Sequence, residues 1–216
     1  MRYIYLHGFA SRPASRKATY FRERFAERGL ELHVPALDGG NFEGLTITGQ
    51  LEVIREHAAG EPCVLIGSSL GGYLAAVYAS RHPEVERIVL LAPAFCFPRR
   101  WEDELGAETF AAWKAEGSRP VFHYGEGREM RIGFGLIEDG MQYEDYPAAT
   151  QPSLLLHGLS DTVVPVEYSR HFVELYPECS TLVEIETDHE MGDVLPLLWS
   201  HTSSFLFDGP EIDSQK

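Results

Sequence analysis

The sequence reads Cys63-Val64-Leu65-Ile66-Gly67-Ser68-Ser69-Leu70-Gly71-Gly72 over residues 63–72, and this stretch decides the fold. A short apolar run, typical of a buried strand, leads into the pattern G-x-S-x-G and then into a helix of small residues. That order is the sequence form of a nucleophile elbow, a tight turn that lifts one serine hydroxyl above the end of a sheet. The residues two before and two after that serine must be small, or they would clash across the turn. Gly67 and Gly71 meet this requirement for Ser69, whereas the residues at the same spacing from Ser68 are large, so Ser69 is the candidate nucleophile.

Length and composition bound the class of protein. The chain of 216 residues is long enough for one domain with a sizeable core, and 44% hydrophobic and 24% charged residues are ordinary for a globular protein. The net charge of −15 argues against nucleic-acid and anionic-membrane partners, which need clustered Lys and Arg. Three widely spaced cysteines are typical of free thiols in a reducing compartment. No apolar run reaches the roughly 18 residues of a membrane span, and the first run is too short for a signal peptide, so a cytoplasmic location is expected.

Apolar runs alternate with helical patterns along the chain. The runs expected to form strands span residues 3–6, 30–34, 63–66, 88–91, 154–156 and 182–185. Apolar residues at helical spacing predict helices over residues 14–28, 47–58, 71–81, 165–175 and 193–206. The central runs are apolar on both faces, as in parallel strands covered by helices, and the alternation in 182–185 suits a sheet edge. We therefore predict an α/β fold with one mostly parallel, six-stranded sheet flanked by helices.

One segment, residues 96–146, interrupts this alternation. It is rich in aromatic residues, and the runs 122–124 and 130–132 flank a glycine-rich turn, so they are able to pair as a hairpin. The segment is either an ordinary insertion with a small core of its own or a cap that supplies an aromatic pocket. The cap is favoured because the insertion leaves the sheet at the C-terminal end of a strand. We expect a single domain over 1–207 that carries this cap, and a disordered polar tail over 208–216.

Candidate partners for Ser69 follow later strands. A serine hydroxyl needs a general base, the base needs an orienting group, and on this architecture the chain order is serine, acid, histidine. Asp161 lies in the loop after the run 154–156, and His189 follows the last strand. The plainer alternatives are a helix-capping aspartate and a surface histidine. Asp188 is an alternative acid, but adjacent side chains on one loop seldom face each other.

Two backbone N–H groups complete the expected site. An acyl-transfer reaction needs donors for the oxyanion that develops on the substrate. One expected donor is the N–H of Leu70, directly after the nucleophile. The other is the N–H of Phe9 in the loop after the first strand, where Gly8 allows a close approach. His7 is expected to support that loop rather than to transfer protons.

These residues resemble known motifs. The chain is similar to the α/β-hydrolase superfamily over nearly its full length, and more narrowly to the small bacterial esterases of the YqiA/YcfP type. The similarity rests on Tyr5-Leu6-His7-Gly8-Phe9, on Ser11-Arg12-Pro13-Ala14-Ser15-Arg16-Lys17-Ala18 and on Gly67-Ser68-Ser69-Leu70-Gly71-Gly72-Tyr73. The Ser-Ser-Leu-Gly-Gly signature is also similar to that of mitochondrial serine hydrolases that cleave acyl glucuronides and thioesters.

The resemblance implies a reduced, six-stranded hydrolase fold and an enzyme that needs no cofactor and no metal. It implies Ser69, Asp161 and His189 as the triad, and Phe9 and Leu70 as oxyanion donors. The expected function is hydrolysis of a small-molecule carboxylic ester or thioester through an acyl-enzyme. Two alternatives stay open. One is an acyltransferase or a carbon–carbon hydrolase on the same scaffold, and the other is a non-catalytic binding protein with a hydrolase fold.

Overall fold

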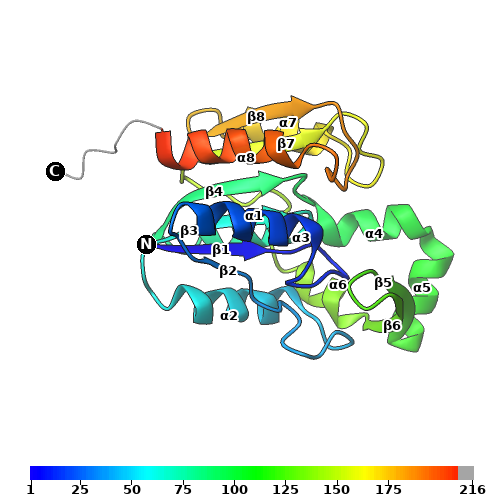
Figure 1. Ribbon diagram of the computed structural model, residues 1–216. Helices are drawn as coiled ribbons and strands as arrows, with labels where there is room; N and C mark the ends of the chain where they lie inside the picture. Colours follow the sequence, from blue (N-terminus) through cyan, green and yellow to red (C-terminus); the bar gives the residue numbers. More distant parts are fainter. Residues whose placement is uncertain (209–216) are drawn as a thin grey trace.

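A six-stranded parallel sheet forms the centre of the computed structural model, which describes residues 1–208 (Figure 1). Its strands are β1 (Arg2–Leu6), β2 (Leu32–His33), β3 (Cys63–Ser68), β4 (Val85–Leu91), β7 (Ser153–Gly158) and β8 (Ser180–Ile185). They lie in the order β2-β1-β3-β4-β7-β8, and every neighbouring pair is parallel. The predicted α/β fold is confirmed, with β8 at an edge of the sheet. The tail expected over 208–216 lies, apart from Asp208, outside the described residues.

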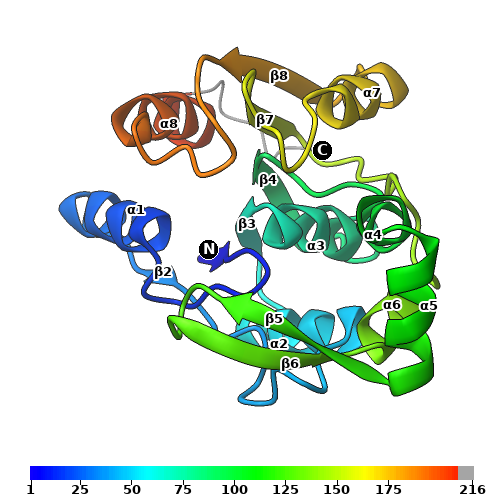
Figure 2. The ribbon, with the colours of Figure 1, turned by 90° about the vertical axis from the view of Figure 1, so that its right-hand side faces the viewer.

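Two layers of helices cover the sheet (Figure 2). Helices α1 (Arg16–Glu27) and α8 (Leu195–Ser203) pack on one face, and α2 (Ile47–Ala58), α3 (Leu70–Ala79) and α7 (Glu167–Leu175) pack on the other. Successive strand residues point into different layers: Ile4 and Leu6 of β1 join one core cluster, and Tyr5 joins the other. Because both faces are buried, the central strands read as continuous apolar runs in the sequence.

The element boundaries follow local sequence signals. Helix α1 begins after Ser15, whose Oγ accepts a hydrogen bond from the Ala18 N–H at 3.4 Å, and ends before Gly29, whose φ is +71°. Ala14, at the start of the predicted helix 14–28, is therefore exposed and outside the helix. The predicted helix 193–206 divides into α8 and a π-helical turn, η1 (Ser204–Asp208). At the sheet edge, β2 pairs over only two residues of the predicted run 30–34.

The segment 96–146 lies beyond the carboxyl ends of the strands (Figure 1). It contains α4 (Phe97–Leu105), α5 (Ala107–Glu116), β5 (Ser118–His123), β6 (Arg128–Gly133) and α6 (Gly135–Gly140). Strands β5 and β6 form the predicted antiparallel hairpin, but they extend beyond 122–124 and 130–132, and Tyr124 lies in the turn. The sequence analysis predicts none of the three helices. Helix α5 buries only Trp113 and α6 has six residues, so neither carries an apolar stripe, whereas α4 carries a short one at Phe97, Trp101 and Leu105.

Aromatic side chains give this segment a core that joins the main core. The ring of Trp113 lies 5.1 Å from that of Trp101 and 5.2 Å from that of Phe134, measured between centroids. Trp113 and Phe134 belong to the same buried cluster as the side chains of α2 and α3. The insertion therefore shares its core with α2 and α3 and does not form a separate core.

Candidate active site

The turn between β3 and α3 holds Ser69 in a conformation that few residues adopt. Its φ is 54° and its ψ is −118°, and such backbone strain concentrates at functional sites. A Cβ built on Gly67 would lie 2.2 Å from the carbonyl oxygen of Gly71. A Cβ built on Gly71 would lie 2.1 Å from the carbonyl oxygen of Leu6. Neighbouring backbone therefore requires both glycines, as the G-x-S-x-G pattern predicts for a turn centred on Ser69.

Ser69, His189 and Asp161 are joined by two hydrogen bonds. His189 Nε2 lies 3.0 Å from Ser69 Oγ, and His189 Nδ1 lies 2.7 Å from Asp161 Oδ2. Ser69 follows β3, Asp161 follows β7 and His189 follows β8. The parallel strands therefore bring three distant parts of the chain together at their carboxyl ends. A carboxylate only accepts hydrogen bonds, so Nδ1 carries the proton and Nε2 is free to accept the serine hydroxyl.

The Asp161 side chain is completely buried and has donors on both oxygens. Oδ1 accepts the N–H groups of Val163 and Val164 at 2.9 and 2.8 Å. Oδ2 lies 2.7 Å from His189 Nδ1 and 3.2 Å from His157 Nε2. Burial alone would raise the pKa of this carboxyl, but the hydrogen bonds from His157, His189 and Val164 outweigh burial and hold the pKa well below its usual range. Asp161 is therefore an anion at neutral pH.

The alternative serine and acid occupy other positions. Ser68 is buried at the end of β3. Asp188 is exposed, and its Oδ1 accepts the Met191 N–H at 3.1 Å within its own loop. Of the two candidate acids, Asp161 is the one that contacts the imidazole of His189.

The loop after β1 lies directly against Ser69. A Cβ built on Gly8 would be 3.3 Å from Ser69 Cβ, so this loop passes the nucleophile at close range. Within residues 1–208, no protein acceptor takes the N–H of Phe9 or of Leu70. Leu70 is the first residue of α3, where a free N–H points along the positive end of the helix dipole. Both groups are available to a ligand oxygen.

His7 stabilises this loop through two hydrogen bonds. Its Nδ1 lies 3.0 Å from the carbonyl oxygen of Gly8, and its Nε2 accepts the Leu37 N–H at 3.3 Å. These contacts fix a neutral ring with the proton on Nδ1. Burial lowers the pKa of His7, which favours the same neutral form.

Two residues that the sequence analysis did not assign to the site lie close to it. Arg100 of α4 is buried and donates to the carbonyl oxygen of Val163, in the loop that holds Asp161. His157 is completely buried and lies beside Asp161. The sequence carries a signal for His157, because it directly follows the apolar run 154–156 and precedes Asp161 by four residues.

The insertion contacts loops on both sides of the site. At the hairpin turn, the Gly125 N–H donates to the carbonyl oxygen of Ala10 at 3.2 Å, in the loop that carries Phe9. The Phe9 ring lies 5.3 Å from Trp101 and 6.4 Å from Phe97, both in α4. Phe9 and Trp101 are only partly buried. The rings of Phe97 and Trp101, called the aromatic wall below, therefore lie next to the residue whose N–H is free, Phe9.

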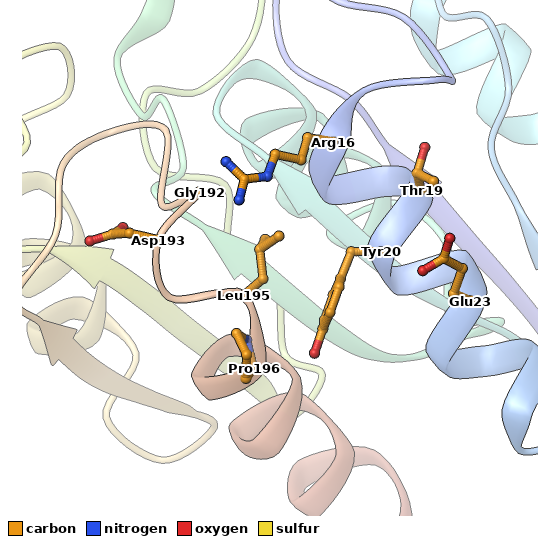
Figure 3. Close-up of a pocket in the computed structure, with 8 residues that line it drawn as sticks. All are labelled: Arg16, Thr19, Tyr20, Glu23, Gly192, Asp193, Leu195 and Pro196. Atoms are coloured by element: carbon orange, nitrogen blue, oxygen red, sulfur yellow. The ribbon is translucent and has the colours of Figure 1, made fainter.

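A groove of about 550 Å³ lies between α1 and the segment that leads into α8 (Figure 3). Arg16 and Tyr20 of α1 line one side, and Gly192 and Leu195 line the other. Neither Ser69 nor its two partners line this groove, although Gly192 is only three residues from His189. Its lining contains one cation and two carboxylates, so its charge does not favour an anionic ligand.

In residues 1–208, no group of three or more His, Cys, Asp or Glu side chains is arranged to hold a metal ion. Among the helices of the same residues, none has the length and apolar character needed to cross a bilayer.

The sheet order, the flanking helices and the turn at Ser69 define an α/β-hydrolase fold. The chain belongs to the family described as Uncharacterised protein family (UPF0227), whose profile matches residues 2–206. The resemblance to the YqiA/YcfP type is thereby confirmed. No curated protein sequence matches the chain.

Several solved structures share this fold at low sequence identity. Alpha/beta hydrolase domain-containing protein 10 from mouse is 23% identical, with a TM-score of 0.78 over 93% of this chain and 87% of that chain. Est1E from Butyrivibrio proteoclasticus with bound ferulic acid is 20% identical, with a TM-score of 0.80 over 95% and 87%. A monoacylglycerol lipase from Paleococcus ferrophilus is 20% identical, with a TM-score of 0.69 over 92% and 93%. The chain is thus a hydrolase-fold protein that resembles esterases and lipases.

Proposed function

We infer that this chain is a serine hydrolase that cleaves small carboxylic esters or thioesters. The observation that carries the proposal is the hydrogen-bonded chain of Ser69, His189 and Asp161, with separations of 3.0 and 2.7 Å. A hydroxyl, a neutral imidazole and a buried carboxylate in this order form an activated nucleophile. Folding alone does not require this combination at the C-terminal edge of a sheet.

The reaction proceeds in two halves on these groups. Ser69 Oγ attacks the acyl carbon while His189 Nε2 takes the hydroxyl proton. The bond to the leaving alkoxide or thiolate then breaks, and His189 returns that proton to the leaving group. A water molecule next attacks the acyl-enzyme, with His189 again as base, and releases the carboxylic acid and Ser69. Throughout, Asp161 holds the Nδ1–H tautomer and stabilises the imidazolium.

The N–H groups of Phe9 and Leu70 are the proposed oxyanion donors. The close approach of Gly8 to Ser69 and the lack of protein acceptors for both N–H groups among residues 1–208 support this role. Donors that are fixed before the reaction stabilise the tetrahedral oxyanion without reorganisation.

The 96–146 segment is proposed to act as a cap that lines the acyl or leaving-group pocket. Its aromatic wall at Phe97 and Trp101, next to Phe9, favours an apolar or aromatic group on the substrate. The ferulic acid bound to Est1E and the monoacylglycerol lipase among the similar structures are in keeping with a carboxylic ester. Because Arg100 and Gly125 attach the segment to loops on both sides, we propose a fixed wall rather than a freely opening lid.

The test compares wild type with Ser69→Ala and with Ser68→Ala as the matched control. Turnover of p-nitrophenyl acetate and butyrate should fall by on the order of 10⁶ in Ser69→Ala. It should stay within about tenfold of wild type in Ser68→Ala, because within residues 1–208 the serine hydroxyl bonded to His189 is that of Ser69. If Ser69→Ala hydrolyses these esters like wild type, the proposal is wrong.

Two further assays separate the rival functions. A fluorophosphonate probe should label wild type at Ser69, and failure to label the folded protein would favour a binding protein without activity. Product analysis with and without an added alcohol distinguishes hydrolysis from acyl transfer. A panel of esters and thioesters of increasing acyl length then defines the substrate.

A further inference from the structure

A second histidine, His157, contacts the same carboxylate oxygen of Asp161 as His189 does. It is the next-to-last residue of β7 and has no exposed surface. Its Nδ1 lies 2.7 Å from Ser169 Oγ of α7. Its Nε2 lies 2.8 Å from the carbonyl oxygen of Val164 and 3.2 Å from Asp161 Oδ2. Both ring nitrogens are therefore occupied by protein groups.

The partners of His157 determine where its proton is. The carbonyl oxygen of Val164 and the carboxylate of Asp161 are both acceptors, so Nε2 must be the protonated nitrogen. Nδ1 is then a lone pair that accepts the hydroxyl proton of Ser169. A neutral ring with the proton on Nε2 satisfies all three contacts. Ser169 is completely buried, so its hydroxyl has no contact with solvent.

The two imidazoles meet at one carboxylate oxygen. Asp161 Oδ2 accepts from His189 at 2.7 Å and lies 3.2 Å from the Nε2–H of His157. With the two backbone N–H groups on Oδ1, the carboxylate has four donors that fix its plane. Each donor also withdraws negative charge, and a less basic carboxylate stabilises the charged form of His189 less.

We propose that His157 is a positioning residue that orients the Asp161 carboxylate and limits how strongly it attracts the His189 proton. Its kinetic consequences rest on the proposed hydrolase function, but its effect on the His189 imidazole does not. The role differs from that of the base, because the contacts of His157 are with Ser169, Val164 and Asp161 and none of them is with Ser69.

Other charged groups surround His157 and Asp161 and must stay unchanged in the test. Lys17 of α1 faces Asp161 and the exposed acids Asp188 and Glu190 of the His189 loop. On the β8 side, Glu184 faces His157 and is paired with Arg170 at 2.7 Å. All of these groups are left in place by a substitution at position 157.

Two polar substitutions separate the contacts of His157. A glutamine amide extends to about the position of Nε2, so His157→Gln keeps a donor to Asp161. An asparagine amide reaches only to about the position of Nδ1, so His157→Asn keeps the contact to Ser169 and loses that donor. The pKa of His189, followed by NMR of ¹⁵N-histidine protein, should rise by roughly half to one unit in His157→Asn and by less in His157→Gln.

The two variants should also differ in their steady-state kinetics. In His157→Asn, kcat for p-nitrophenyl acetate should fall by about tenfold with KM little changed, and the acid limb of the pH profile should move to higher pH. His157→Gln should recover most of this loss. A purely structural role would lower the melting temperature of both variants and leave the His189 pKa and the pH profile unchanged.

The outcomes distinguish this inference from the proposed function. If wild type hydrolyses no ester, the proposed function fails, and the His189 pKa still tests the role of His157. If the two variants have equal His189 pKa values and equal kinetics, the inference is wrong. Should neither variant fold, the ¹⁵N spectrum of wild type decides: a protonated Nε2 and an unprotonated Nδ1 on His157 support the inference, and the opposite tautomer overturns it.

Discussion

Gly71 of α3 lies directly against the end of β1, where a Cβ would be 2.1 Å from the carbonyl oxygen of Leu6. The same Cβ would be 2.7 Å from the carbonyl oxygen of His7. Both neighbours are backbone atoms, so no rotamer change could relieve the clash. This contact fixes the turn at Ser69 relative to the loop of Phe9, which makes Gly71 a determinant of both fold and site.

We predict that Gly71→Ala is strongly destabilising. Moving β1 or α3 to admit the methyl group should cost about 3 kcal/mol or more of unfolding free energy, measured by urea denaturation. Gly135→Ala is the matched control, because no atom lies within 4 Å of the added Cβ and the glycine has no positive φ. The control should be neutral or slightly stabilising, and an equal loss in both variants would contradict the steric argument.

The acid of the site is tested by exchanging each candidate carboxylate for an amide. Asp161→Asn should lower kcat by about 10⁴, because an amide does not hold the Nδ1–H tautomer of His189. Asp188→Asn should keep kcat within about tenfold of wild type, since Asp188 only accepts a backbone N–H of its own loop. Steady-state hydrolysis of p-nitrophenyl butyrate measures both. A larger loss in Asp188→Asn would reverse the assignment.

The fold was accessible from the sequence because its signals are local and agree with one another. Apolar runs buried on both faces predict the six strands, and the small residues around Ser69 predict the turn. The order of Asp161 and His189 after later strands predicts their meeting at one edge, and the structure brings them into contact.

The remaining features depend on contacts that a single sequence does not display. Helices α5 and α6 lack apolar stripes, since the core of the segment is built from a few large aromatic rings; α4 carries a short stripe of Phe97, Trp101 and Leu105. Arg100 reads as an ordinary surface cation, although it is buried against the loop of Val163. Beyond its position after an apolar run, His157 has no distinguishing motif in the sequence, and its contact with Asp161 at 3.2 Å follows from the path of the chain after β7.

The depressed pKa of Asp161 predicts a pH dependence of stability. The pKa of an unfolded aspartate is about 3.9, and the pKa of folded Asp161 lies below it. The ionised carboxylate therefore stabilises the folded state above about pH 4, and this stabilisation is lost as the pH falls through the folded pKa. Asparagine at this position does not titrate. The difference in unfolding free energy between wild type and Asp161→Asn should therefore be constant above about pH 5 and shrink as the pH falls from there toward about 2. Urea melts at several pH values measure it, and a constant difference would show that the carboxylate is not stabilised by its donors.

The aromatic wall predicts a change in acyl preference. Trp101→Ala removes a ring that lies 5.3 Å from that of Phe9, so kcat/KM should fall about tenfold for butyrate or aromatic acyl esters relative to acetate. Phe110→Ala is the control: Phe110 lies in the same segment and packs 5.3 Å from Phe134. It should change stability without changing the ratio of butyrate to acetate. If both variants alter that ratio equally, the effect comes from the packing of the segment as a whole, and Trp101 does not line the pocket.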